Sequence, residues 1–247
     1  MPYEPDTAMG GPSGRFPSTR HSAILSLKSA NSGERERAWA AVTESYWKPA
    51  YKYIRIQWNK SNDEAKDLTQ AFFTAAFEKD YLGRYDAAKG SFRTFLRKCL
   101  DGFVANRNQA ASRLKRGGGT PALPLDFENA EGELESLPVK GGLDTEAFFY
   151  KEWVRHLFSS ALEELRQECA GKNAGYEMLE RYDVDQTAAS YEQLARDMNL
   201  SVTAVTNQLA AARRRFRRIV LERIRQVSAT EEEFQREAKQ LLGSKWR

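Results

Sequence analysis

Apolar residues recur at steps of three and four along the first half of the chain, which is the spacing of one face of an α-helix. Three segments before residue 117 show this pattern. Their apolar positions are Trp39, Val42, Tyr46, Ala50 and Tyr53 in the first, Ala65, Leu68, Phe72, Phe73, Ala76 and Phe77 in the second, and Phe92, Phe95, Leu96, Leu100, Phe103 and Val104 in the third. Pro49 interrupts the first segment and predicts a kink there, because proline lacks the amide hydrogen of the helix ladder.

The second half of the chain returns to the same spacing from Thr145 onwards. Its apolar positions are Phe148, Phe149, Trp153, Leu157, Ala161, Leu162 and Leu165, and, after a glycine-containing break at 171–175, Tyr176, Met178, Leu179 and Tyr182. No segment keeps the two-residue alternation that is typical of a half-buried strand. We therefore predict an all-α fold with essentially no sheet.

Composition divides the helical segments into two domains. Residues 117–145 begin with three glycines, contain three prolines and carry more acidic than basic side chains. Because this stretch shows no periodic apolar face, it predicts a flexible acidic linker between a helical domain at 19–116 and a second at 146–226. Residues 1–18 are rich in Pro, Gly and Ser, and they predict a disordered extension.

Residues 227–247 form an extension beyond the second domain. Thr230 and Glu233 have the spacing of a capping box, which indicates the start of a helix. The apolar face of this helix consists of Phe234, Ala238, Leu241 and Leu242. Two alternatives remain open for it: the helix packs on the neighbouring domain, or it serves as a regulatory contact.

Several functional classes are excluded by what the sequence lacks. No apolar run approaches the ~20 residues that span a bilayer, and the first residues show no secretory signal, so we expect a cytoplasmic protein without a membrane partner. The two cysteines and two histidines stand apart, which argues against structural zinc and against a disulfide framework. A phosphate-binding loop and the common catalytic arrangements are also missing. We therefore expect no catalytic residue, no metal and no cofactor.

The net charge is only +4, but the basic residues are concentrated in two clusters. The first, in which Asp101 is the only acid, consists of Lys89, Arg93, Arg97, Lys98, Arg107, Arg113, Lys115 and Arg116. The second, opposed by Glu222 alone, consists of Arg213, Arg214, Arg215, Arg217, Arg218, Arg223 and Arg225. Two separate basic faces predict a polyanionic partner that is contacted in two places.

Residues 190–209 have the pattern of a helix-turn-helix, whose second helix normally enters the major groove of DNA. The inward positions of its two helices are Leu194, Ala195 and Met198 in the first and Val202, Val205 and Leu209 in the second. Asn199 suits the left-handed residue that ends a helix, and Ser201 suits the cap of the next one. The pattern also fits a plain helical hairpin whose polar residues face water.

The residues expected to contact DNA here are Ser201, Thr203, Thr206, Asn207, Gln208, Arg213, Arg214 and Arg215. Asn207 and Gln208 can pair with adenine edges, and Thr206 with a phosphate or a base. Five arginines in six residues exceed what solubility requires. This concentration of charge favours DNA contact over the plain hairpin. Each phosphate that an arginine neutralises releases counterions, which strengthens binding.

The order of these segments resembles a bacterial sigma factor of the extracytoplasmic-function group, over about Thr19 to Arg225. Three stretches carry the resemblance. Residues 63–73, DEAKDLTQAFF, resemble the motif that docks on the polymerase β′ clamp helices. Residues 90–96, GSFRTFL, resemble the start of the helix that melts and reads the −10 element. Residues 190–215 resemble the helix-turn-helix that reads the −35 element.

The resemblance implies a non-catalytic subunit that binds core RNA polymerase, at its β′ clamp helices and β flap, and directs recognition and melting of promoter DNA. The polymerase contacts that it implies are Glu64, Asp67, Gln70 and Phe73. The −10 contacts that it implies are Tyr85, Arg93, Arg97, Lys98, Asp101, Phe103, Arg107, Arg113, Lys115 and Arg116. Asp67 and Gln70 lie one helical turn apart and so face the same way. An anti-sigma factor or other regulatory partner remains an open question.

This sequence departs from the family pattern in its recognition helix. Thr206, Gln208, Ala210 and Ala211 stand where the family usually has Lys, Arg or His, so the −35 contacts would be weaker or differently specific. Two other functions were weighed. An autonomous helix-turn-helix regulator would bind operators without polymerase, but it would not explain the Asp67 and Gln70 pair or the first basic cluster. An enzyme acting on nucleic acid lacks any recognisable catalytic motif.

Overall fold

The computed structural model describes residues 22–111, 125–135, 144–169, 175–185 and 190–243. Helices account for most of these residues, and none of them lies in a strand, so the prediction of an all-α fold is confirmed. The extension predicted at 1–18 lies outside the described residues. Along the described ranges, no helix combines the length and the apolarity that crossing a bilayer requires.

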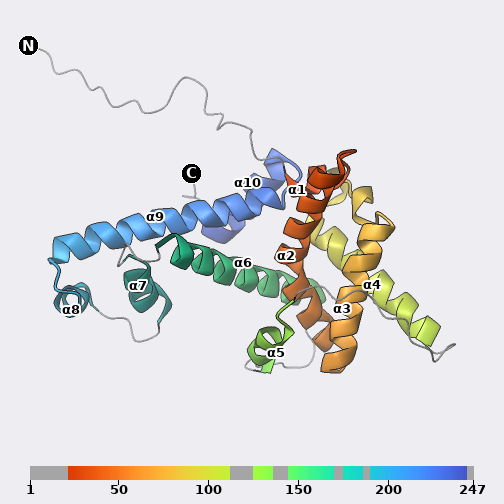
Figure 1. Ribbon diagram of the computed structural model, residues 1–247, viewed down its shortest axis with the longest axis horizontal. Coiled ribbons are helices and arrows are strands. Elements are labelled where there is room, and N and C mark those ends of the chain that lie inside the picture. Colours follow the sequence, from red (N-terminus) through yellow and green to blue (C-terminus); the bar gives the residue numbers. More distant parts are fainter. Residues whose placement is uncertain (1–21, 112–124, 136–143, 170–174, 186–189, 244–247) are drawn as a thin grey trace, which may run out of the picture.

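The described elements follow one another along the chain as helices (Figure 1). In chain order they are α1 (Ala23–Ser26), α2 (Ser32–Gln57), α3 (Asn62–Glu78), 3-10 turns at Leu82–Arg84 and Ala87–Lys89, α4 (Phe92–Ala111), α5 (Phe127–Glu135), α6 (Thr145–Cys169), α7 (Gly175–Leu179) with a π-helical turn at Glu180–Val184, α8 (Tyr191–Asp197), α9 (Val202–Gln226) and α10 (Glu231–Leu242).

Helices α2, α3 and α4 pack around apolar faces that follow the predicted spacing. Val42, Phe72 and Leu96 are completely buried, one from each helix. The capping box of α3 joins Ser61 and Glu64: the Glu64 amide donates to Ser61 Oγ at 3.3 Å, and the Ser61 amide donates to the Glu64 carboxylate at 3.0 Å. Helix α2 continues through Pro49 as one helix.

Helices α6 and α9 lie side by side and form an arm that extends from the α2–α4 part of the molecule (Figure 1). Phe158 and Phe216 stack between them with ring centroids 5.9 Å apart, and Leu165 and Ile219 are buried. Helices α7 and α8 lie at the far end of this arm. The arm therefore places the helix-turn-helix away from α4.

The local structure predicted for the helix-turn-helix is confirmed. Ser201 Oγ accepts from the Ala204 amide at 3.1 Å and caps α9, and Asn199 adopts the left-handed conformation with φ of 52°. Val205 and Leu209 are buried as expected. The prediction for Val202 is wrong, because its side chain is 43% exposed in the first turn of α9.

The prediction of a flexible linker without an apolar face at 117–145 is wrong for residues 127–135, which form α5. Phe127, Ala130 and Leu134 are buried on one face of this helix. The Phe127 ring lies 5.4 Å from Trp47 and 5.1 Å from Tyr51 of α2, centroid to centroid. Residues 117–124 and 136–143 of the predicted linker lie outside the described residues. The acidic helix α5 is thus packed on α2, within the lobe formed by α2, α3 and α4.

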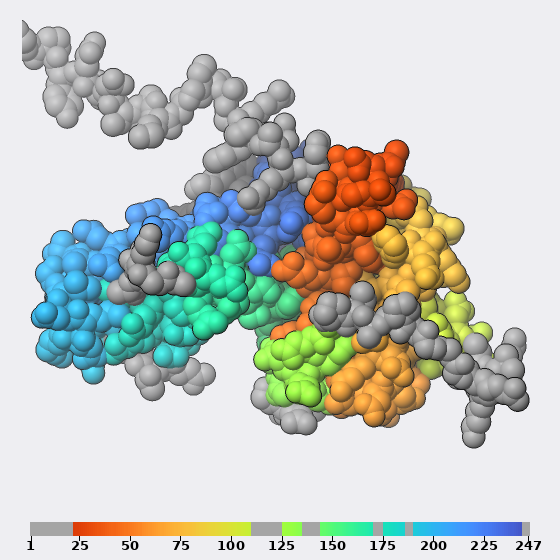
Figure 2. Space-filling model, viewed as in Figure 1, coloured from red at the N-terminus to blue at the C-terminus, as the bar shows by residue number. Residues whose placement is uncertain are grey.

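The two predicted domains share one continuous cluster of buried residues in the described structure. Tyr46 of α2 stacks on Trp153 of α6 with centroids 6.4 Å apart. Lys52 of α2 forms ion pairs with Glu133 of α5 at 2.6 Å and Glu152 of α6 at 3.0 Å. The space-filling view shows α2, α5 and α6 in contact (Figure 2). We use "closed form" below for this packing of the α6–α9 arm on α2.

Helix α10 turns back from the end of α9 and packs beside it (Figure 1), and its Glu233 and Glu237 side chains reach α4. Phe234 and Ala238 are buried, as the apolar pattern predicted, and so are the carboxylates of Glu233 and Glu237. The structure therefore shows that this extension packs on the rest of the chain.

Candidate nucleic-acid interface

The exposed face of α9 begins directly after its N-cap. Thr203 and Asn207 are exposed and lie four residues apart, and Gln208 beside them is half-buried. The Thr206 hydroxyl donates to the Val202 carbonyl at 2.9 Å, so its hydrogen is already used within the helix. Thr203 and Asn207 are therefore the residues best placed to meet the edges of bases.

Continuing this face in steps of three and four leads to Arg214 and Arg218, both exposed. Arg218 is held by Glu168 at 2.9 Å and by Glu222 at 3.2 Å. Arg214 shares the face of Asn207 and extends the polar surface by two turns. Its position makes it the arginine best aligned with the Thr203 and Asn207 side chains.

Arg213 points elsewhere than the sequence suggested. Its guanidinium makes two hydrogen bonds to Asp183, at 2.8 and 2.6 Å, and lies 5.3 Å from the centre of the Tyr182 ring. The bonds to Asp183 raise the pKa of Arg213 above its usual value. Arg215 is exposed and approaches Cys169 Sγ at 4.0 Å. Arg213 thus fastens α9 to the π-helical turn, a role that the run of arginines gave no signal for.

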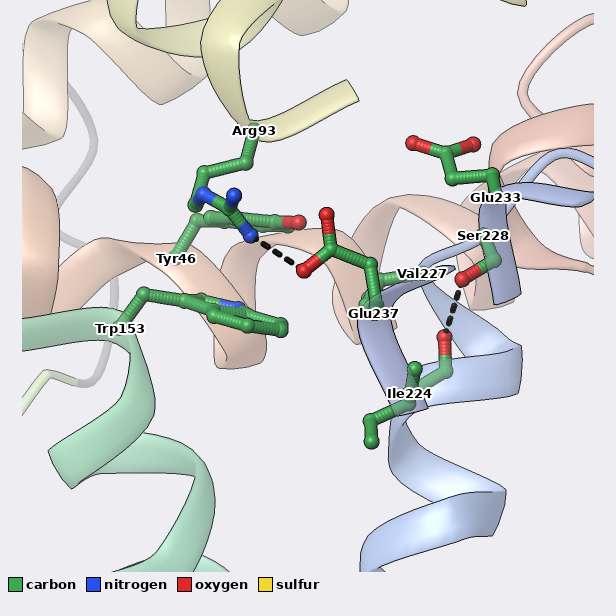
Figure 3. Close-up of a pocket in the computed structure, with 8 residues that line it drawn as sticks. All are labelled: Tyr46, Arg93, Trp153, Ile224, Val227, Ser228, Glu233 and Glu237. Carbon is green, nitrogen blue, oxygen red and sulfur yellow. Dashed lines mark hydrogen bonds and ion pairs between the residues drawn. The ribbon is translucent and has the colours of Figure 1, made fainter. Parts of the chain in front are cut away.

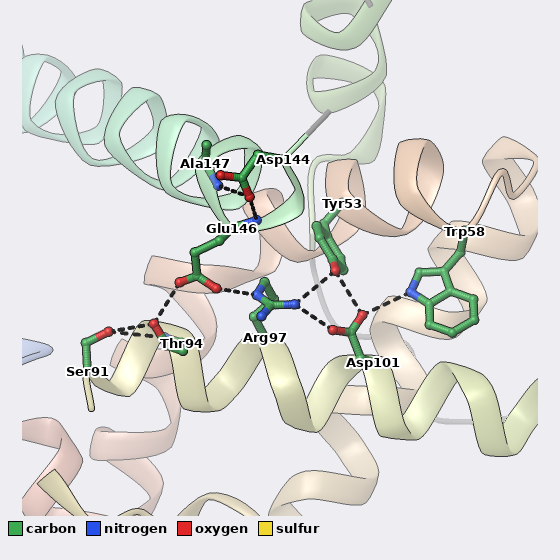
Figure 4. Close-up of polar contacts among 9 residues, drawn as sticks. All are labelled: Tyr53, Trp58, Ser91, Thr94, Arg97, Asp101, Asp144, Glu146 and Ala147. Carbon is green, nitrogen blue, oxygen red and sulfur yellow. Dashed lines mark hydrogen bonds and ion pairs between the residues drawn. The ribbon is translucent and has the colours of Figure 1, made fainter. Parts of the chain in front are cut away.

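On α4, Arg97 and Asp101 belong to a polar network with neighbouring helices (Figure 4). Arg97 donates to Asp101 at 2.7 Å and to Glu146 of α6 at 2.7 Å. Asp101 also accepts from the Tyr53 hydroxyl at 2.9 Å and from the Trp58 indole at 3.3 Å. Burial acts to lower the pKa of Arg97, but its hydrogen bonds to Tyr53 and Glu146 raise it overall.

Tyr85 and Arg93, which the sequence assigned to −10 DNA, are covered by α10. The Tyr85 hydroxyl lies 3.1 Å from Glu233, and Arg93 donates to Glu237 at 2.8 Å (Figure 3). The Arg93 guanidinium also lies 4.9 Å from the centre of the Trp153 ring. Burial raises the pKa of Tyr85, and the charge of Glu233 raises it further.

Of the remaining residues predicted to contact −10 DNA, some are exposed on α4 and others lie outside the described residues. Lys98 and Arg107 are exposed, and the Arg107 guanidinium lies 5.3 Å from the centre of the half-buried Phe103 ring. Phe103 packs edge-on against Phe72, so part of its surface belongs to the core. The other candidates, Arg113, Lys115 and Arg116, lie outside the described residues.

The face of α3 that was expected to meet polymerase is only partly as predicted. Asp67 is exposed and Gln70 is half-buried on the same side of the helix, while Glu64 is engaged in the capping box. Phe73 is completely buried, packed against Phe72 at 5.2 Å, so its inclusion in a contact surface is wrong for the closed form. The sequence had placed Phe73 both on the apolar face of this helix and among the polymerase contacts, and its burial fits the apolar face.

Sequence reasoning placed Phe77 in the buried stripe and missed its exposed surface. Its side chain is 39% exposed at the end of α3. Trp39 of α2 lies beside it, with centroids 5.5 Å apart, and the Arg35 guanidinium lies 5.9 Å from its ring. Phe77 stands seven residues after Gln70, close to two helical turns, so these two side chains share one face, and Asp67 lies about 60° from Gln70 around the helix. The α3 face therefore combines a carboxylate, an amide and an aromatic edge.

Within the described residues, no group of three or more His, Cys, Asp or Glu side chains is arranged to hold a metal ion. The two best-formed cavities there have volumes of about 10 Å³ each, the space of one water molecule. Comparison of the chain with protein-family models, with curated proteins and with solved structures finds no match.

Proposed function

We propose that this chain is a sigma factor, a non-catalytic subunit that binds core RNA polymerase and directs it to promoters for melting and initiation. The observation that carries the proposal is the capped helix-turn-helix of α8 and α9. Its second helix presents Thr203, Asn207 and Arg214 on one exposed face. This combination suits a helix in the major groove, where hydroxyl and amide groups read bases and arginine contacts phosphate.

The second basic region supports a protein that holds DNA in two places. Arg107 is exposed on α4, which lies at the other end of the molecule from α8 (Figure 1), and the exposed Lys98, nine residues earlier, lies on the opposite side of this helix. A single-stranded segment is bound by cationic side chains that follow its backbone and by aromatic rings that stack on bases. Arg107 above the edge of Phe103 offers both kinds of group side by side.

The α3 face supports contact with a protein partner rather than with DNA. Its carboxylate, Asp67, would repel phosphates but would pair with a basic helix. Exposed aromatic surface such as that of Phe77 is enriched at protein interfaces. Asp67, Gln70 and Phe77 together therefore suit the β′ clamp helices that the sequence motif suggested.

Reconstitution with core RNA polymerase tests the proposal. We expect the chain to co-elute with core enzyme and to give promoter-specific transcripts that core enzyme alone does not make. Asp67→Ala should weaken core binding about tenfold, as loss of a well-placed polar contact does. Glu36→Ala, which removes the same charge from an exposed site on α2, should leave binding unchanged.

Two results would overturn the proposal. Failure of the purified chain to associate with core enzyme would remove the sigma function. Tight, specific duplex binding by the chain alone, unaffected by core enzyme, would indicate an autonomous helix-turn-helix regulator instead.

A further inference from the structure

The N-terminal end of α4 is in contact with two carboxylates of α10. The Glu233 carboxylate accepts a hydrogen bond from the Phe92 amide at 2.8 Å and lies 3.1 Å from the Tyr85 hydroxyl, whose nearer acceptor is the Gly90 carbonyl at 2.8 Å. One turn further along, Glu237 accepts from Arg93 at 2.8 Å (Figure 3). Segments 141 to 148 residues apart in the chain are thus joined through acid groups.

These carboxylates are buried, which is unusual for glutamate. Glu233 and Glu237 are 4% and 6% exposed, and the Arg93 side chain is 11% exposed. Carboxylates are almost never buried unless charge partners or hydrogen bonds compensate for the lost water. Glu233 gains a further donor, the Ala229 amide at 2.9 Å, within its own extension. The acids of α10 are therefore matched to donors on α4 and its preceding turn.

The donors that α10 occupies are those that an anionic strand would need. A backbone amide at a helix N-terminus, a guanidinium and a hydroxyl are together suited to a phosphate. Tyr85 and Arg93 are also residues that the sequence assigned to contact with the melted strand. A carboxylate and a phosphate cannot occupy the same donors together, so docking of α10 and binding of DNA at this position exclude each other.

The fit of α10 against α4 is incomplete. The Arg93 Nε is buried and finds no acceptor among the described residues. It borders a cavity of about 10 Å³ between α4, α6 and α10, lined also by Tyr46 and Trp153. A donor left without a protein partner weakens the docked state relative to one in which it is satisfied.

Among the described residues, helix α10 is joined to the rest of the chain only at the end of α9. It is the last helix described, it spans only 12 residues, and it follows directly from the end of α9. Isolated helices of this length are marginally stable in water, so α10 depends on its contacts for structure. Its apolar contribution to the core is small, chiefly Phe234 and Ala238.

We propose that α10 is an autoinhibitory helix whose Glu233 and Glu237 occupy the N-terminal end of α4 in place of the DNA strand. This inference rests on the proposed function, because it takes the covered surface to be the one that holds the melted strand. Release of α10 uncovers the Phe92 amide, Arg93 and Tyr85, and the state in which α10 is docked on α4 is the inactive one.

The test compares two double variants that carry the same change in charge. Glu233→Gln with Glu237→Gln removes the carboxylates that dock α10. Glu232→Gln with Glu36→Gln removes two exposed carboxylates, one on α10 and one on α2. Hydrogen exchange of α10 amides reports docking, while exchange in α2 and α6 reports whether the rest of the fold is intact. Fluorescence anisotropy with a labelled single-stranded oligothymidine measures access to the α4 surface.

We expect α10 amides to exchange faster in the docking variant, with protection of α2 and α6 retained. Its oligothymidine affinity should rise about tenfold above that of the control. This is the change expected if α10 is undocked in about one wild-type molecule in ten and in most molecules of the variant. Phe234→Ser, which weakens the apolar side of α10 without changing charge, should raise affinity in the same direction.

Unchanged exchange in the docking variant would show that the carboxylates do not hold α10, and the proposal would be wrong. Faster exchange with unchanged oligothymidine affinity would show that α10 covers no strand-binding surface, which also overturns it. Core RNA polymerase is absent from these measurements. Failure of core binding would therefore count against the sigma function alone, whatever the oligothymidine shows.

Discussion

The side chain of Lys52 is buried between α2, α5 and α6. Its side chain is 2% exposed, that of Glu152 is 1% exposed, and their charged atoms are 3.0 Å apart. Glu133 completes the group at 2.6 Å from the Lys52 amine. Removing Lys52 would leave the buried Glu152 carboxylate with the half-exposed Arg155 as its charge partner, which is unfavourable. Because the three residues come from α2, α5 and α6, this group makes the closed form depend on all three helices.

His156 makes the packing of α6 on α2 sensitive to acid. Its Nε2 donates to the Glu44 carbonyl at 2.6 Å, so the neutral ring already has the hydrogen that this bond requires. Burial lowers the pKa of His156 from 6.5 to about 4, against the opposing effect of the bond to Glu44. Lys48 and Arg223 nearby lower the pKa further, because their positive charges oppose protonation.

We expect the free energy of unfolding to fall as the pH drops from 6.5 towards 4. In this interval the unfolded chain binds a proton at His156 and the folded chain does not, so acid favours unfolding, by up to about 3 kcal/mol. Urea denaturation between about pH 7 and 5 measures the effect. His156→Gln, which cannot titrate, should show a shallower dependence, and equal slopes would contradict the assignment to His156.

At the scale of helices, periodicity located the long elements and missed α5. Seven of the nine α5 residues are neither Phe nor Leu, and four are glutamate, so composition indicated a solvated tether. Helix α5 is held on α2 by Phe127, packed against Trp47 and Tyr51, and by ion pairs of Lys48 with Glu133 at 2.8 Å and of Arg55 with Glu131. Pairs between segments far apart in sequence leave no local pattern, and for the same reason the partners of Arg93 and Arg213 could not be anticipated.

The surface of α9 leads to a prediction that separates two neighbouring arginines. Arg214 continues the exposed face of Asn207, whereas Arg213 is bound to Asp183. Arg214→Ala should flatten the dependence of duplex affinity on salt by about 0.9 log units per log unit of salt, the value of one phosphate contact. Arg213→Ala should change the slope less, because Asp183 already neutralises its charge.

Anisotropy titrations at several salt concentrations measure these slopes, with Arg217 and Arg218 left intact. Circular dichroism is the control, since Arg213→Ala also removes a tie between α9 and the π-helical turn. If Arg214→Ala keeps the wild-type dependence of duplex affinity on salt, Arg214 does not contact DNA. A larger change in Arg213→Ala would mean that DNA displaces Asp183.

At the scale of the whole molecule, the closed form places the two proposed DNA-binding faces on one packed body. Promoter elements named −10 and −35 lie about 85 Å apart along straight B-DNA, at 3.4 Å per base pair. Helix α9 has 25 residues, a length of about 38 Å, and its C-terminal end already packs near α2 and α10. Simultaneous contact with both elements therefore requires the arm to move away from α2 or the DNA to bend.

We expect the arm to separate from α2 when the chain binds core RNA polymerase. Glu44 of α2 and Arg223 of α9 form an ion pair at 3.3 Å, so dyes on the exposed neighbours Ala40→Cys and Gln226→Cys lie close in the closed form. With both native cysteines replaced by serine, energy transfer between these dyes should fall when core enzyme is added. A pair within one lobe, Ala40→Cys and Lys79→Cys, should keep its transfer. Unchanged transfer in a chain that co-elutes with core enzyme would mean that the closed form itself binds polymerase, and that the DNA must bend to reach both faces.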